Sequence, residues 1–317
     1  MYRIGIDLGG TNIAVGLVDQ SCEIIVKKST PTLASRPSDE ITADMAKLCL
    51  EVCAEVKTPI HEIESIGIAA PGIANLDNGC VEYSCNLPFR RYPIVKKLAS
   101  MLDVNESKIK IANDANAAAY GEAVAGAARG SSNSIMVTLG TGVGGGIIID
   151  GKIFTGFNHG AGEIGHIVIE TNGALCGCGR RGCWEAYSSA TALIRMTKEK
   201  IEECEKSGRY TLMSKAERIS GRTACDAMRA GDEAAKEVYD KYVYYLATGI
   251  TNMINIFQPK ILCIGGGVCN EGDTLLIPLK ELTDREQYTR DSDKKTKIVI
   301  ASLGNDAGII GAAALGR

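Results

Sequence analysis

The densest group of metal-ligating side chains in the sequence lies between residues 166 and 183. One imidazole and three thiolates occur there: His166, Cys176, Cys178 and Cys183. Glycines among them let the chain wrap tightly around an ion. Such a set fills all four positions of a tetrahedral zinc ion and leaves none for a reacting water. The pattern predicts a structural zinc site, and the alternative is a set of unrelated buried thiols.

Two glutamates flank this group. Glu163 lies three residues before the histidine, and Glu185 lies two residues after the last cysteine. A bound metal would position both carboxylates, which can accept hydrogen bonds from sugar hydroxyls. The alternative is that both are surface charges or ion-pair partners, which is the commoner fate of a glutamate.

Three glycine-rich turns follow apolar stretches that are typical of strands. Glycines free the backbone to turn sharply, so that amides can approach an anion. In the first turn, the aspartate at position 7 could also hold a magnesium ion, directly or through water. The three turns are Asp7-Leu-Gly9-Gly10-Thr11, Leu139-Gly140-Thr141-Gly142-Val-Gly-Gly-Gly146 and Gly265-Gly266-Gly267.

The second turn contains the pattern G-x-G-x-x-G, which a helix must follow in a dinucleotide-binding fold. Residues 147–149 are three isoleucines that indicate a strand instead, which argues against NAD binding. A protein kinase would also carry H-R-D and D-F-G, and both are absent, as is the Walker sequence. We interpret the three turns as the lining of one nucleotide site, with simple tight-turn geometry as the alternative.

Asn113 and Asp114 lie where a predicted strand ends and a predicted helix begins. Both residue types are preferred at a helix N-cap, so a purely structural role is one interpretation. The other is chemical, because phosphoryl transfer needs a positioned base beside the attacking hydroxyl. Asp114 would then accept the proton of a sugar hydroxyl, and Asn113 could hold a second hydroxyl.

The elements that position these residues alternate between strands and helices, which indicates an α/β protein. The opening residues 4–19 predict strand, glycine turn and strand. Further strands are expected at residues 66–70, 109–112, 261–264 and 298–301. Helices are expected at residues 40–57, 94–102, 115–128, 191–204, 232–256 and 307–315.

Two segments of the chain resemble each other in sequence. Leu8, Gly9 and Asp19 match Leu139, Gly140 and Asp150, in each case 131 positions later. Both segments read as strand, glycine turn, strand and acidic turn. The match predicts two related halves, each of which opens with a β-hairpin.

Composition limits the class of protein. The 317 residues are 45% hydrophobic and 23% charged, with a net charge of −3, which predicts a soluble globular chain without an overall basic surface. We therefore expect no nucleic-acid partner. No signal peptide is expected, and no apolar run reaches the ~20 residues of a membrane helix, which predicts a cytoplasmic protein. Most of the twelve cysteines, such as Cys49, Cys53 and Cys263, are expected in the core.

With these motifs in place, the sequence resembles the ROK family of bacterial sugar kinases and repressors over essentially its whole length. The zinc pattern is specific to that family. The motifs that carry the resemblance are Asp7-x-Gly-Gly-Thr11, Ala70-Pro-Gly72, Asn113-Asp-Ala-Asn116, Leu139 to Gly146, Gly160-Ala-Gly-Glu163-Ile-Gly-His166, Cys176-x-Cys178-Gly-x-x-Gly-Cys183-x-Glu185 and Gly265-Gly-Gly267.

The resemblance implies an actin-like ATPase fold, which is ribonuclease H-like, with duplicated β-hairpin phosphate loops. It implies two domains. Residues 1–115 and 304–317 would form a small N-terminal domain, and residues 116–303 a large domain that carries the zinc. A homodimer or a homotetramer is the implied assembly.

The resemblance also implies ATP-dependent phosphorylation of a hexose at its 6-hydroxyl, with Mg²⁺ as a further cofactor. Among family members the chain looks most like the glucokinases, which make glucose 6-phosphate. Asp114 would be the base, the first two glycine turns would contact phosphates, and the third would contact the adenosine. The hexose contacts implied are Asn86, Asn113, Asp114, Glu163, His166 and Glu185.

Three alternatives stay open. The acceptor could be another hexose, such as N-acetylmannosamine or N-acetylglucosamine, because sugar choice depends on pocket shape. The donor could be polyphosphate, which would need extra basic residues beside the site. A sugar-sensing repressor is the third, but only six residues precede Asp7, where family repressors carry a helix-turn-helix domain.

Overall fold

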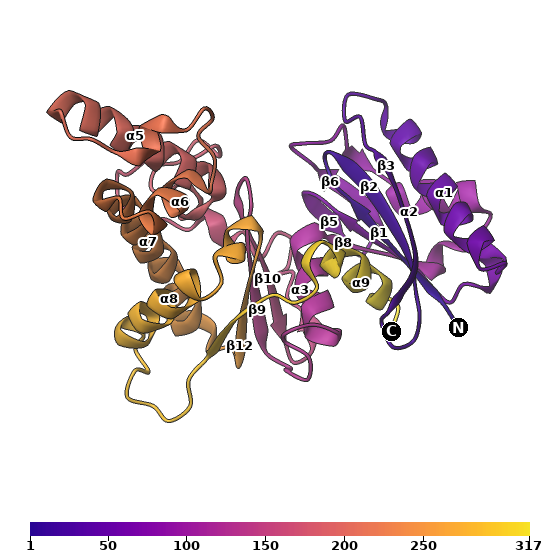
Figure 1. Ribbon diagram of the computed structural model, residues 1–317. Coiled ribbons are helices and arrows are strands. Elements are labelled where there is room, and N and C mark those ends of the chain that lie inside the picture. Colours follow the sequence, from indigo (N-terminus) through magenta and orange to yellow (C-terminus); the bar gives the residue numbers. More distant parts are fainter. The chain divides into compact units, whose positions relative to one another are not determined.

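The computed structural model describes all residues, 1–317, and shows an α/β chain with two five-stranded sheets and one smaller sheet (Figure 1). In the first sheet the strand order is β3-β2-β1-β4-β8. Strands β1 to β3 are antiparallel neighbours, whereas β4 and β8 continue the sheet in parallel. The bounds are β1 (Arg3–Leu8), β2 (Asn12–Val18), β3 (Ile24–Pro31), β4 (Ile66–Ala70) and β8 (Ile109–Asn113).

The second sheet repeats this topology, with the order β11-β10-β9-β12-β13. Strands β9 and β10 have the same lengths as β1 and β2 and lie 131 residues after them. The duplication expected from the sequence is therefore confirmed. The bounds are β9 (Ser134–Leu139), β10 (Val143–Ile149), β11 (Lys152–Ile153), β12 (Ile261–Gly265) and β13 (Lys297–Ile300).

A third, antiparallel sheet follows β4 along the chain, and the sequence did not predict it. Its strands are only three or four residues long, too short to show an alternating pattern. They are β5 (Ile73–Asn75), β6 (Cys80–Tyr83) and β7 (Arg90–Tyr92).

The six predicted helices are all present, with small shifts at their ends. Three further helices were not predicted, and one of them, α8, contains Pro278, which weakens its sequence signal. No helix of the chain combines the length and the apolar character needed to cross a membrane. The bounds are α1 (Ser38–Glu55), α2 (Ile94–Leu102), α3 (Asp114–Val124), α4 (Glu185–Ser188), α5 (Ala190–Ser207), α6 (Thr223–Arg229), α7 (Glu233–Phe257), α8 (Asp273–Glu286) and α9 (Ala307–Ala314).

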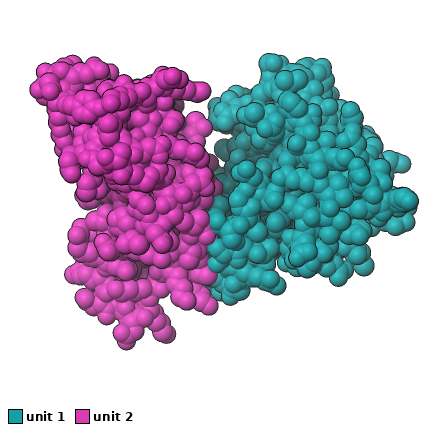
Figure 2. All heavy atoms as spheres, viewed as in Figure 1, with its two compact units in different colours: residues 1–136, 146–162, 301–317 teal, residues 137–145, 163–300 magenta.

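Packing separates the chain into two compact units, coloured in Figure 2. Unit 1 consists of residues 1–136, 146–162 and 301–317, and unit 2 of residues 137–145 and 163–300. Helix α3 belongs to unit 1 because it packs closely on α9. The domain limits expected from the sequence, with a division between residues 115 and 116, differ from these units and stay a prediction.

The core of unit 1 shows why β1 sits at the centre of its sheet. Ile4, Ile6 and Leu8 alternate along the strand and are fully buried in one cluster with Ile41 and Met45 of α1. Burying each of these side chains contributes roughly 1.5–3 kcal/mol to folding. The apolar alternation therefore fixes the register of β1 and, with it, the position of the glycine turn that follows.

Helix α9 lies against the first sheet and against α3 through residues without bulky side chains. A Cβ added at Gly67 of β4 would lie 1.8 Å from the carbonyl oxygen of Ala312. A Cβ added at Gly311 would lie 1.7 Å from the carbonyl oxygen of Ala117 in α3. Larger residues would push these elements apart, so the small residues hold the start of α3 in place.

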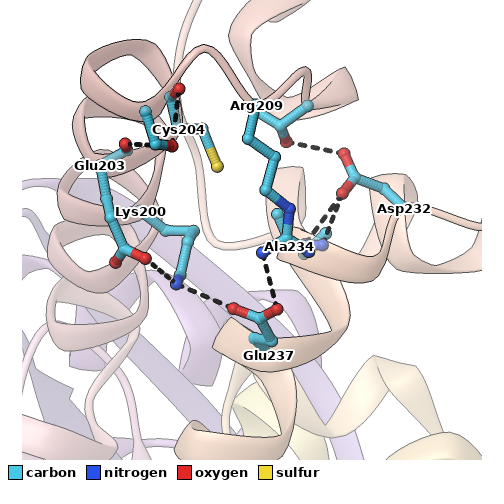
Figure 3. A network of polar contacts seen from close by, with 10 residues as sticks. Lys200, Glu203, Cys204, Arg209, Asp232, Ala234 and Glu237 are labelled. Carbon is cyan, nitrogen blue, oxygen red and sulfur yellow. Dashed lines mark hydrogen bonds and ion pairs between the residues drawn. The ribbon is translucent and has the colours of Figure 1, made fainter.

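In unit 2 a polar network joins α5 to α7 (Figure 3). Lys200, only 16% exposed, bridges Glu203 and Glu237 at 2.8 Å each, and Arg209 also reaches Glu237 at 2.8 Å. Asp232 caps α7 through the amides of residues 234 and 235 and accepts from the backbone of residue 212. The network ties α7 to α5, the helix whose amino-terminal residues Ala190 and Thr191 contact the second glycine turn.

Candidate active site

Asn113 ends β8 and is the N-cap of α3. Its Oδ1 accepts a hydrogen bond from the Asn116 amide at 3.1 Å, and its Nδ2 donates to the Gly72 carbonyl at 3.0 Å. The helix-cap interpretation is therefore correct for Asn113. A side-chain amide has two N–H groups, so this bond leaves one N–H of Asn113 for a further acceptor.

Asp114 is the first residue of α3 and is half-buried. Its Oδ1 accepts from the Ala115 amide at 2.9 Å, at a helix end whose dipole favours negative charge. Asp7, at the end of β1, lies close to it. Burial raises the pKa of Asp7 to about 6, the negative charge of Asp114 adds to the rise, and Lys27 opposes it. The structure thus brings two predicted site residues together.

The first glycine turn is held from both sides by Thr32, which is fully buried. The Thr32 hydroxyl donates to the Gly9 carbonyl at 2.6 Å, and the Thr32 amide donates to the Thr11 carbonyl at 2.8 Å. Asn86 borders the same turn, because a Cβ added at Gly10 would lie 3.7 Å from the Asn86 Cβ. Thr32 could not be predicted as a site residue from the sequence, because its contacts with the turn are non-local and leave no pattern along the chain.

The second glycine turn is held by the amino-terminal end of α5. The Ala190 amide donates to the Gly140 carbonyl at 2.9 Å, and the Thr191 hydroxyl donates to the Thr141 carbonyl at 2.8 Å. Within the turn, the Gly140 amide donates to the Gly142 carbonyl at 3.0 Å. These contacts hold the first half of the turn, at Gly140 and Thr141, against α5.

The third glycine turn lies against the second. Gly266 has a φ of +105°, and a Cβ there would lie 2.1 Å from the Leu139 carbonyl oxygen. Both the backbone conformation and the space demand glycine at this position. Two of the three predicted nucleotide turns are therefore neighbours in unit 2.

The predicted metal ligands form one compact cluster. The four donor atoms lie within 4.8 Å of one another. Cys176 Sγ is 3.7 Å from His166 Nδ1, and Cys178 Sγ is 3.7 Å from Cys183 Sγ. Four ligands at Zn–S distances of about 2.3 Å would place neighbouring sulfurs about 3.8 Å apart. The donor set and its spacing fit a structural zinc ion, as predicted.

The two flanking glutamates have different surroundings. Glu163 is exposed and precedes the short 3-10 helix η3 (Ile164–His166). Glu185 begins α4 and is half-buried, and its Oε2 accepts from the Val143 amide at 3.1 Å. Its Oε1 lies 3.4 Å from Cys176 Sγ. Glu185 therefore joins the metal loop to the second glycine turn and is not a plain surface charge.

Comparison with known proteins agrees with this geometry. The model of the ROK family matches residues 3–317. The chain is 38% identical over 314 residues to a glucokinase from Thermotoga maritima, covering 98% of this chain and 96% of that protein. It is 37% identical over 313 residues to a glucokinase from Halalkalibacterium halodurans, covering 98% and 93%.

A solved structure supports the same relationship. The crystal structure of a ROK family glucokinase from Streptomyces griseus, in complex with glucose and AMPPNP, superimposes with a TM-score of 0.80. The two chains are 32% identical, and the match covers 99% of each. The duplicated sheets have the actin-like ATPase fold that was expected. The sequence motifs, the fold and the full-length similarity agree, and the chain belongs to the ROK family.

Proposed function

We propose that this chain is an ATP-dependent hexose kinase that converts glucose to glucose 6-phosphate. The glucokinases similar to it over nearly their whole length support this proposal, as does the related structure with glucose and AMPPNP. The observation in this chain that carries it is the juxtaposition of Asp114 with Asp7 at the first glycine turn. A carboxylate base beside a phosphate-binding turn is the arrangement that phosphoryl transfer requires.

In the proposed reaction, the hexose 6-hydroxyl donates a hydrogen bond to the Asp114 carboxylate. Its oxygen attacks the γ-phosphorus of ATP while the bond to the β–γ bridging oxygen breaks. The proton passes to Asp114, and ADP leaves with the electron pair of the broken bond. The amide of Ala115 donates to one oxygen of this carboxylate and so fixes its orientation at the start of α3.

A magnesium ion fits beside Asp7, because this carboxylate supplies hard oxygen ligands and the neighbouring charge of Asp114, which raises the pKa of Asp7, adds negative charge that a cation would offset. When bound, the ion would neutralise charge on the phosphates. The hexose contacts proposed from the family resemblance are Asn86, Asn113, Glu163, His166 and Glu185. The phosphate contacts are the turns at Gly9 to Thr11 and Gly140 to Gly142, and the adenosine contact is Gly265 to Gly267.

The oligomeric state and the cellular location are further proposals, and both rest on the family resemblance. We expect a homodimer or a homotetramer in the cytoplasm, without nucleic-acid or membrane partners. Light scattering coupled to gel filtration would test the assembly, and a monomer at micromolar concentration would contradict it.

A sugar panel tests the function. Purified protein with ATP and Mg²⁺ is offered glucose, mannose, N-acetylmannosamine and N-acetylglucosamine, and ADP release is measured. Polyphosphate replaces ATP in a parallel series. We expect glucose with ATP to give the highest kcat/KM. An N-acetyl sugar as the best acceptor, or no hexose-dependent ADP release at all, would contradict the proposal.

A further inference from the structure

We propose that Glu185 couples the hexose site to the nucleotide turn, so that the hexose and ATP bind cooperatively through this one carboxylate. The inference rests on the proposed function, because it assumes that Glu185 contacts the hexose. It goes further by assigning Glu185 a second contact, on the backbone of the second glycine turn, and an energetic consequence of that contact.

The Glu185 carboxylate contacts two residues of the second glycine turn, Gly142 and Val143. Oε2 of Glu185 accepts from the Val143 amide at 3.1 Å. The same oxygen fills the space beside Gly142, where an added Cβ would lie only 2.2 Å from it. Glycine at position 142 therefore makes room for the carboxylate. The φ of Gly142 does not fall in the left-handed region, so the backbone conformation alone does not demand glycine there.

Val143 is held on its other side by the segment that carries the predicted zinc and sugar ligands. A Cβ added at Gly165 would lie 2.1 Å from the Val143 carbonyl oxygen. Gly165 directly precedes His166. Both backbone groups of Val143 thus lie against elements that the proposed function assigns to the hexose site.

The first half of the same turn depends on a different element. Helix α5 holds the carbonyls of Gly140 and Thr141 through Ala190 and Thr191. The turn therefore has one half held by a scaffold helix and one half held by Glu185. A change at Glu185 should move only the second half.

This arrangement predicts positive cooperativity. A glutamate side chain has several rotamers, and holding it in one orientation has an entropic cost. A hexose hydroxyl bonded to the carboxylate would restrict Glu185 to the orientation that also holds the Val143 amide. The nucleotide would then meet a turn that is already ordered, and by linkage the hexose must bind more tightly when nucleotide is present.

Two alanine substitutions in the same turn form a matched pair. In Gly142→Ala the new methyl group displaces the Glu185 carboxylate. In Gly140→Ala the new methyl group meets nothing within 4 Å, and this residue also lacks a left-handed φ. Both variants add bulk to the nucleotide turn, so an effect on nucleotide affinity is common to the two. Only the first breaks the proposed link.

The measurement is the glucose Kd by calorimetry, with and without saturating AMPPNP and Mg²⁺. The ratio of the two values is the coupling factor, which does not depend on how tightly either variant binds nucleotide once it is saturated. We expect glucose to bind about tenfold more tightly to the natural protein when AMPPNP is present. The factor should fall to within about twofold of one in Gly142→Ala and stay at the natural value in Gly140→Ala.

Zinc content and the thermal midpoint are measured for each variant, and Gly142→Ala should keep both. A natural coupling factor in Gly142→Ala would overturn the inference while leaving the proposed function intact. So would the same loss of coupling in Gly140→Ala. A natural protein that fails to bind glucose would instead remove the proposed function, and the inference would fall with it.

Discussion

The carboxylates of Asp7 and Asp114 are electrostatic neighbours in unit 1, although the two residues lie 107 positions apart in the sequence. Asp7 is the second-to-last residue of β1, and Asp114 is the first residue of α3. Helix α9 closes the arrangement, because a Cβ at Gly308 would lie 2.9 Å from the Asp7 carboxyl carbon. Two acids so placed repel one another, so a cation would stabilise them jointly.

This pair predicts a pH-dependent gain in stability for Asp7→Asn in metal-free protein. A folded-state pKa of about 6, against an ordinary value of 3.8, means that the native state binds more protons than the unfolded state between these values. The ionised carboxyl group therefore destabilises the native state as pH rises. The variant should gain about 3 kcal/mol at pH 7.5 and about half of that at pH 5.

Urea denaturation of EDTA-treated protein at both pH values would measure the gain. Asp19→Asn is the control with the opposite sign. The pKa of Asp19 is lowered by hydrogen bonds from the backbone of Glu23 and from Ser21, so its loss should destabilise. A gain for Asp7→Asn that is the same at pH 5 and pH 7.5 would contradict the assignment.

Asp114→Asn tests the base directly. Asparagine keeps an oxygen for the Ala115 amide, so the start of α3 should remain intact. It cannot accept the hydroxyl proton, and kcat should fall by a factor on the order of 10³. Glucose affinity, measured by calorimetry, should change little. A variant that turns over at the natural rate would exclude Asp114 as the base.

The zinc site predicts about one zinc per chain by elemental analysis. Cys178→Ser should lose the metal and weaken glucose affinity, because the metal loop would no longer position Glu185. Cys80→Ser, outside the cluster and half-buried, is the control and should keep the zinc.

The single tryptophan, Trp184, gives a second measurement. It is fully buried beside Cys183, so its fluorescence emission reports whether this loop loosens when zinc is lost. If Cys178→Ser loses its zinc but binds glucose with natural affinity, the zinc does not position Glu185 for glucose binding.

Substitution of Glu122, which is not one of the proposed reacting groups, should cause a large loss of stability. This carboxylate is fully buried in α3 and accepts from the Ala127 amide at 2.6 Å and from the Leu303 amide at 2.8 Å. Glu122→Gln replaces one acceptor by a donor and leaves a buried amide unpaired. We expect a loss of about 1–3 kcal/mol in urea denaturation. The exposed Glu202→Gln should change stability by less than about 0.5 kcal/mol, and equal effects of the two changes would refute this role.

Much of the molecule could be predicted because its signals are local. The alternation of Ile4, Ile6 and Leu8 and the spacing of apolar residues in α5 and α7 each fit one element, and those elements are present. The same holds for the hairpin repeat, whose two copies share strand lengths and turn positions. The zinc ligands could also be predicted from the sequence, because three of the four lie within eight residues of one another.

The rest was decided by contacts between distant segments. Strands β5 to β7 are too short to carry a period and exist because they pair with one another. The unit limits depend on the close packing of α3 on α9, which requires glycine at position 311. The contact between Glu185 and the Val143 amide joins residues 42 positions apart, and no pattern along the chain marks it. Residue types and spacing thus determined which groups could do chemistry, whereas tertiary packing decided which of them touch.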